Sequence, residues 1–106
     1  MDRRDVDLIV ARIQPLFAQR RNTRYWLLIA NDPYDHAINF FFNQQSLGHR
    51  LKSTPLHSAT GDLSELEQVI SALGQHFQFS IEYTGFTGMR WPSTWHLIEK
   101  KKESGE

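Results

Sequence analysis

The sequence predicts an α+β domain in which two helices pack on one face of a mainly antiparallel four-stranded sheet. Two segments have apolar residues at helical spacing, and others have the alternating or unbroken apolar runs of strands. Their order allows a helix-strand-strand unit to occur twice, over residues 5–43 and 62–100. A chain of 106 residues can bury a core without disulfide bonds, so we expect one domain over residues 1–100 and a flexible tail over residues 101–106.

The first helix is predicted from an apolar stripe near the N-terminus. Its residues recur at i, i+3, i+4, i+7 and i+11, the spacing of one helix face. Pro15 lies inside this pattern and cannot donate a hydrogen bond to the carbonyl of Ala11, so we expect a kink or an early end. The stripe consists of Val6, Ile9, Val10, Ile13 and Phe17.

A central strand and a turn are predicted next. Residues 25–30 are apolar at both parities, which is typical of a strand covered on both faces. Residues 31–35 have strong turn chemistry, with Pro33 suited to the second position of the turn.

The segment over residues 36–47 fits two structures. In a strand, Ile38, Phe40 and Phe42 would share one face. In a helix, Asp32 would be the N-cap and the segment would end at Gly48. Phe and Asn are both poor helix formers, but Asn is also poor in strands, so propensity does not decide between the two structures; we favour the strand.

The second helix is predicted by its capping residues. Asp62 is followed three residues later by Glu65, the spacing of a capping box, and Gly74 follows the last apolar residue, where a C-terminal cap is expected. Residues 46–61, which precede it, have no clear period and are expected to connect elements. Strands are predicted after it over residues 77–84 and 94–100. The stripe of this helix consists of Leu63, Leu66, Val69, Ile70 and Leu73.

The loop between the last two predicted strands is the main candidate for a binding surface. Residues 85–93 include bulky apolar side chains where a simple turn would have small polar ones. Trp and Arg are enriched among residues that anchor protein interfaces. The alternative is that Phe86 and Trp91 fold back over one end of the core. The predicted partner-binding residues are Phe86, Met89, Arg90, Trp91 and Trp95.

The predicted sheet also has an open face. With both helices on one side, Trp26 and Phe41 would lie on the other, where they would form an apolar surface. Self-association as a homodimer would cover that surface.

Two alternative functions rest on smaller clusters. Arg20, Arg21 and Arg24 precede Tyr25 and Trp26, a pattern that suits a nucleic-acid-binding accessory protein because cations neutralise phosphates and rings stack on bases. The overall charge of zero disfavours this function.

The third interpretation is a small His-dependent hydrolase or nuclease. His49, Arg50 and His57 would supply a general base and a phosphate-binding cation. A polar loop with no catalytic role explains these residues more simply, so no catalytic residue is assigned and an enzyme is not favoured.

The composition of the chain also bears on cysteine chemistry, metal sites and cellular location. The chain has no cysteine, which excludes disulfides, zinc–thiolate sites and thiol catalysis. Its five histidines have no pair at i+2, i+3 or i+4, so we expect no metal and no cofactor. The longest apolar run is far shorter than the roughly 20 residues of a membrane span, and no secretion signal is apparent, so no membrane partner and a cytoplasmic location are expected.

The favoured function is a small soluble, non-enzymatic interaction or regulatory module. It would bind a protein partner through the aromatic loop and the sheet face.

Overall fold

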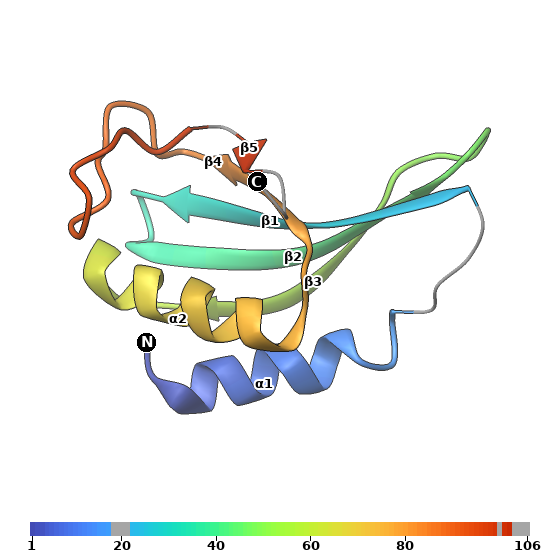
Figure 1. Ribbon diagram of the computed structural model, residues 1–106, viewed down its shortest axis with the longest axis horizontal. Coiled ribbons are helices and arrows are strands. Elements are labelled where there is room, and N and C mark those ends of the chain that lie inside the picture. Colours follow the sequence, from blue (N-terminus) through green and yellow to red (C-terminus); the bar gives the residue numbers. More distant parts are fainter. Residues whose placement is uncertain (18–21, 100, 103–106) are drawn as a thin grey trace.

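The computed structural model describes residues 1–17, 22–99 and 101–102, and over these residues the chain is an α+β fold, as predicted (Figure 1). Two helices lie on one face of a mixed, mostly antiparallel sheet, whose strand order is β3-β2-β1-β4-β5. Strand β1 pairs with β2 antiparallel and with β4 parallel, and the other two pairs are antiparallel. The elements are α1 (Arg3–Ile13), β1 (Thr23–Asp32), β2 (Ala37–Ser46), β3 (Lys52–Ala59), α2 (Leu63–His76), β4 (Ser80–Thr84) and β5 (Lys101–Lys102).

The helices begin where their capping residues predict. Asp62 and Glu65 form the expected capping box of α2, and Asp2 and Asp5 form an equivalent box at α1. Helix α1 ends two residues before Pro15, which confirms the early end. The prediction of a cap at Gly74 is wrong: α2 continues to His76. A glycine inside a helix costs only about 1 kcal/mol, and backbone hydrogen bonds continue past it.

The segment over residues 36–47 is a strand, which confirms the favoured alternative. Ile38, Phe40 and Phe42 of β2 are buried on the side of the helices. Asn39 and Phe41 alternate with them and therefore point to the open face.

The sequence predicts a connecting region over residues 46–61, and this prediction is wrong, because β3 lies within it. A register shift between Phe40 and Phe41 places Phe41 opposite Pro55 and Phe40 opposite His57, so Leu56 is an extra residue of the strand. The bulge and the proline break the alternation from which a strand is recognised. As a result, three strands precede α2, and the expected repeat of a helix-strand-strand unit does not occur.

The predicted strands after α2 are also shorter or absent. Strand β4 begins at Ser80, because Phe77 and Phe79 lie in an aromatic cluster beneath the sheet. Of the second predicted strand the structure describes residues 94–99, which are irregular apart from one bridge between Arg90 and Leu97. In the expected tail, Lys101 and Lys102 pair with β4, and residues 103–106 lie outside the described residues.

The core lies between the helices and the sheet. Phe17, which follows α1, contacts Tyr25, Phe42 and Phe79 with ring centroids 4.9 to 6.4 Å apart, in edge-to-face geometry. In the part of the chain that is described, no helix is long and apolar enough to cross a membrane. The side chains that are almost completely buried include Ile9, Ile13, Ile29, Phe40, Phe42, Leu66 and Leu73.

Candidate functional site

The aromatic loop is attached to the end of β1 through Gly85. This glycine has φ +82°, and a Cβ at this position would lie 2.4 Å from the carbonyl oxygen of Asn31. The Asn31 side-chain amide donates a hydrogen bond of 3.0 Å to the Gly85 carbonyl. Glycine is therefore required here both by its backbone angle and by the close approach of β1.

Three of the predicted partner-binding residues pack on the protein's own core. Phe86 is 3% exposed, and Met89 and Trp91 are half-buried against the core. Phe86 and Trp91 contact the ring of Tyr83 edge-on, with centroids 6.0 and 5.4 Å away. Burial raises the pKa of the Tyr83 hydroxyl. Phe86 is therefore unavailable to a partner, and the alternative in which Phe86 and Trp91 fold over one end of the core describes both side chains.

Beyond Phe86 the chain forms a small hairpin over residues 89–98. The N–H of Ile98 donates to the carbonyl of Met89, and the N–H of Trp91 donates to the carbonyl of His96, each at 2.9 Å. At the tip, Ser93 donates to the carboxylate of Glu67 on α2 from its backbone N–H at 3.0 Å and from its hydroxyl at 2.5 Å. Hydrogen bonds to an ionised carboxylate are among the stronger ones in proteins, so the tip of this hairpin is attached to α2.

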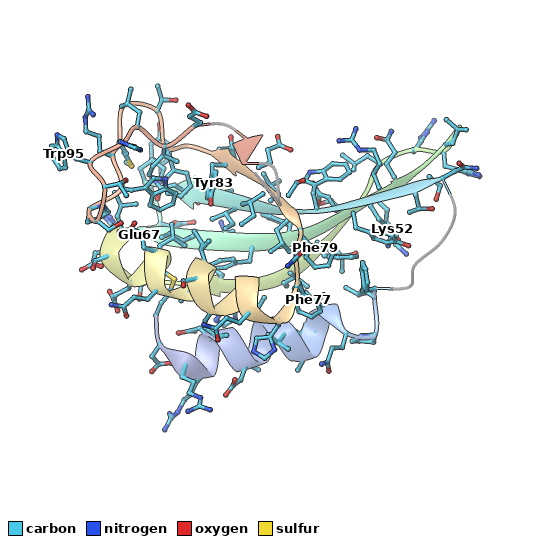
Figure 2. The ribbon with its side chains drawn as sticks, viewed as in Figure 1. Lys52, Glu67, Phe77, Phe79, Tyr83 and Trp95 are labelled. Carbon is cyan, nitrogen blue, oxygen red and sulfur yellow. The ribbon has the colours of Figure 1, made fainter. Side chains whose placement is uncertain are left out.

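Trp95 projects from this hairpin into solvent. Its side chain is 69% exposed and lies at the edge of the molecule, while Tyr83 lies further in (Figure 2). The Arg90 guanidinium lies 5.7 Å from the Trp95 ring centroid and donates a 2.7 Å hydrogen bond to the Trp95 carbonyl. Leu97, paired with Arg90 by the bridge, is 52% exposed. We call Arg90, Trp95 and Leu97 the Trp95 patch.

The backbone of Trp95 is strained. Its φ is +61°, in the left-handed region that bulky side chains rarely adopt. A non-glycine residue in this region costs about 1–2 kcal/mol. The hairpin bonds and the Arg90 contact maintain this conformation. Strained residues of this kind cluster at functional sites.

Arg90 and Trp95 are the two predicted partner-binding residues that the structure brings together at the surface. Leu97 is not among the predicted partner-binding residues, because the sequence predicts a strand over residues 94–100. No local feature of the sequence distinguishes it. Only the hairpin, which pairs it with Arg90, places it in the patch.

The open face of the sheet is less exposed than the sequence indicated. Trp26 and Phe41 lie on this face and are half-buried. The Trp26 indole N–H donates to the Glu82 carboxylate at 3.1 Å, and the Arg24 guanidinium lies 5.8 Å from the Trp26 ring centroid. Neighbouring side chains of the same chain therefore occupy both the edge and the face of this ring.

The edge of the sheet at β3 is also partly blocked. Pro55 has no N–H to donate to a further strand, and the Arg12 guanidinium of α1 donates to the carbonyl of Leu56. Addition of a partner strand along this half of β3 is therefore disfavoured.

The cluster proposed for an enzyme is not assembled. His49 and Arg50 lie in the exposed turn between β2 and β3, whereas His57 lies towards the other end of β3. His57 follows Arg50 by seven positions, which correspond to roughly 20 Å of extended chain. His57 instead contacts the Asp5 carboxylate of α1 at 2.6 Å, and this hydrogen bond lowers the pKa of Asp5. Among the described residues, no group of three acidic or histidine side chains could hold a metal ion.

The predicted nucleic-acid cluster is only partly described. Arg20 and Arg21 lie outside the described residues, and Arg24 is exposed on β1 beside Trp26.

An open hollow of about 390 Å³ lies elsewhere, between the start of α1, the start of β2 and the end of β3. It is lined by Met1, Asp5, Ala37, Ser58, Ala59 and Thr60.

No model of a protein family matches this chain, and neither a curated protein nor a solved structure is significantly similar to it.

Proposed function

We propose that this chain is a non-enzymatic protein-binding module and that the Trp95 patch is its partner-binding surface. The observation that carries the proposal is an exposed tryptophan on a hairpin that is attached to the rest of the fold. Trp95 has a strained backbone, and its ring projects from the surface although other aromatic residues of the same loop are packed inward.

The composition of the patch suits a protein partner. Trp and Arg are the residues most enriched among interface positions that dominate binding energy. Trp95 would bury a large apolar area, Leu97 would extend it, and the guanidinium of Arg90 has donors beyond the one it uses on the Trp95 carbonyl.

The attachment of the hairpin to the fold supports the proposal, because it reduces the conformational entropy that binding would cost. A binding loop that must become ordered on association loses affinity for each side chain it immobilises. Here the Ser93–Glu67 hydrogen bonds and the packing of Phe86 and Trp91 fix the hairpin before any partner arrives. Trp95 would therefore bind with little further loss of conformational freedom.

Recovery of partners from a native lysate tests this function with two matched variants. Trp95→Ala removes the exposed ring, and Leu8→Ala removes a 43% exposed apolar side chain of α1 that is distant in sequence and on a different element. We expect Trp95→Ala to reduce recovery of specific partners by at least about tenfold, which is 1.4 kcal/mol. Leu8→Ala should recover them as the wild type does.

Two outcomes would contradict the proposal. Equal recovery by Trp95→Ala and the wild type would exclude the patch as the binding surface, provided that both chains are folded by circular dichroism. Recovery that nuclease treatment abolishes would instead favour the nucleic-acid alternative. A second copy of this chain counts as a protein partner, and sedimentation velocity of the purified wild type and Trp95→Ala identifies that case.

A further inference from the structure

A second exposed apolar surface lies at the opposite end of the molecule from Trp95. Strands β1, β2 and β3 extend past the helices there, and β2 and β3 are joined at the tip of this extension (Figure 1). We call residues 22–26 and 44–54 the arm. Lys52 lies at this end, far from Trp95 (Figure 2).

The tip of the arm exposes two leucines. Leu47 is 78% exposed and Leu51 is 50% exposed. Between them, Gly48 has φ +79°, and the His49 N–H donates to the Ser46 carbonyl at 3.0 Å, so the chain reverses in a hydrogen-bonded turn. The Leu47 N–H donates to the Asn22 carbonyl at 2.8 Å, which continues the pairing of β1 and β2 to the tip. The two leucines are thus presented by a paired turn.

The arm is cationic and contains no carboxylate. The sequence has no Asp or Glu over residues 8–31 or 36–61, and the arm is built entirely from these two stretches. Arg24, Arg50 and Lys52 are exposed on it, with His49 in the turn. The arm therefore has a net positive charge in a chain whose overall charge is zero.

From this combination we propose that the tip of the arm binds the surface of an anionic lipid bilayer. The leucines would enter the boundary between headgroups and acyl chains, and the cations behind them would contact lipid phosphates and carboxylates. The long stems of arginine and lysine allow their charged groups to stay at headgroup level while the tip penetrates. This is association with a membrane surface and requires no membrane-spanning segment.

The shape of the arm favours a bilayer over the other polyanions. Exposed leucines have no partner on the phosphate backbone of a nucleic acid, where charge and stacking provide the affinity. A projecting tip would need a matching cavity in a folded protein partner, whereas a fluid bilayer closes around any convex apolar group. The proposal is independent of the Trp95 patch, because the two surfaces lie at opposite ends.

Vesicle sedimentation with the full chain tests the proposal. We expect the wild type to sediment with phosphatidylserine-containing vesicles and to remain in solution with vesicles of phosphatidylcholine alone. The double variant Leu47→Ser, Leu51→Ser should bind anionic vesicles about tenfold more weakly. Tyr34→Ser removes a 93% exposed side chain in the turn at the opposite end of β1 and should bind as the wild type does. High salt should weaken binding of the wild type, because screening reduces the charge attraction.

Three results would overturn the proposal. One is absence of binding to the anionic vesicles. Another is equal binding by the wild type and the double leucine variant. The third is tight, salt-sensitive binding of a single-stranded oligonucleotide that the leucine substitutions leave unchanged but that Arg50→Gln with Lys52→Gln abolishes. That last result would assign the arm to a nucleic acid.

Discussion

The hairpin over residues 89–98 and the arm, which is the extended end of β1, β2 and β3, both expose apolar side chains, but they are attached to the fold in different ways. The first is hydrogen-bonded to α2 through Ser93 and packed on the core through Trp91. The tip of the arm extends beyond the helices, where hydrogen bonds join its own strands and turn; they include a bond between the Thr23 and Ser46 hydroxyls and one from the Gln45 side-chain amide to the His49 carbonyl. Trp95 is thus held in one orientation at one end of the molecule, whereas Leu47 and Leu51 lie on a projecting turn at the other end.

This difference bears on what each end could bind. A fixed ring such as that of Trp95 suits a partner with a defined complementary surface, because its orientation is set in advance. A projecting tip with two leucines suits a partner that can adapt its shape. Matched substitutions in the hairpin over residues 89–98 and in the arm test whether the two are attached to the fold in different ways.

The largest difference is expected for the residue that attaches the first hairpin to the core. Phe86→Ala should lower the free energy of unfolding by about 3–5 kcal/mol, because it leaves a cavity beside Tyr83 in a fully packed region. Leu47→Ala at the tip of the arm should change it by less than about 0.5 kcal/mol, because that side chain is mainly in water. Urea denaturation of both variants checks this prediction. Similar values for the two would show that Phe86 does not support the hairpin.

A smaller difference is expected for the two glycines that begin or reverse these segments. Gly85→Ala adds a Cβ that meets the backbone of Asn31, in a left-handed conformation, and should cost at least about 2 kcal/mol. Gly48→Ala has nearly the same φ, but no atom lies within 4 Å of the added Cβ, so it should cost only about 1 kcal/mol. Thermal unfolding of the matched pair separates the close contact from the backbone angle. Equal losses would remove the close contact between the loop and β1 from the account.

The parts of the fold that the sequence predicted are those set by local periodicity and caps. The stripe of Val6 to Ile13, the capping box of Asp62 and Glu65 and the alternation of Ile38, Phe40 and Phe42 each involve neighbouring residues, and each predicted its element correctly. Phe17, the last residue of the predicted stripe, lies beyond the end of α1. Strand β3 was missed because its bulge at Leu56 and its Pro55 remove the alternation, and only pairing with β2 stabilises it as a strand. Propensity in a strand depends on its neighbours more than on its own residues.

The candidate site was predicted only in part, because it too depends on contacts between residues that are distant in the sequence. Its aromatic content identified the loop, and Arg90 and Trp95 were among the residues named. Composition could not tell which ring packs inward, because Phe86, Trp91 and Trp95 are all bulky aromatic residues. That distinction depends on contacts with Tyr83 and Glu67, which lie on different elements, and on the positive φ of Trp95.

Partner recovery by Trp95→Gly, compared with Trp95→Ala, tests the central claim most directly. Glycine relieves the left-handed strain, so the Gly variant should be more stable than the Ala variant by about 1 kcal/mol. Both variants should fail to recover partners that the wild type binds, because both lack the exposed ring. Retention of full binding by the more stable Trp95→Gly chain would contradict the account, since binding would then depend on a well-folded hairpin and not on the tryptophan that it presents.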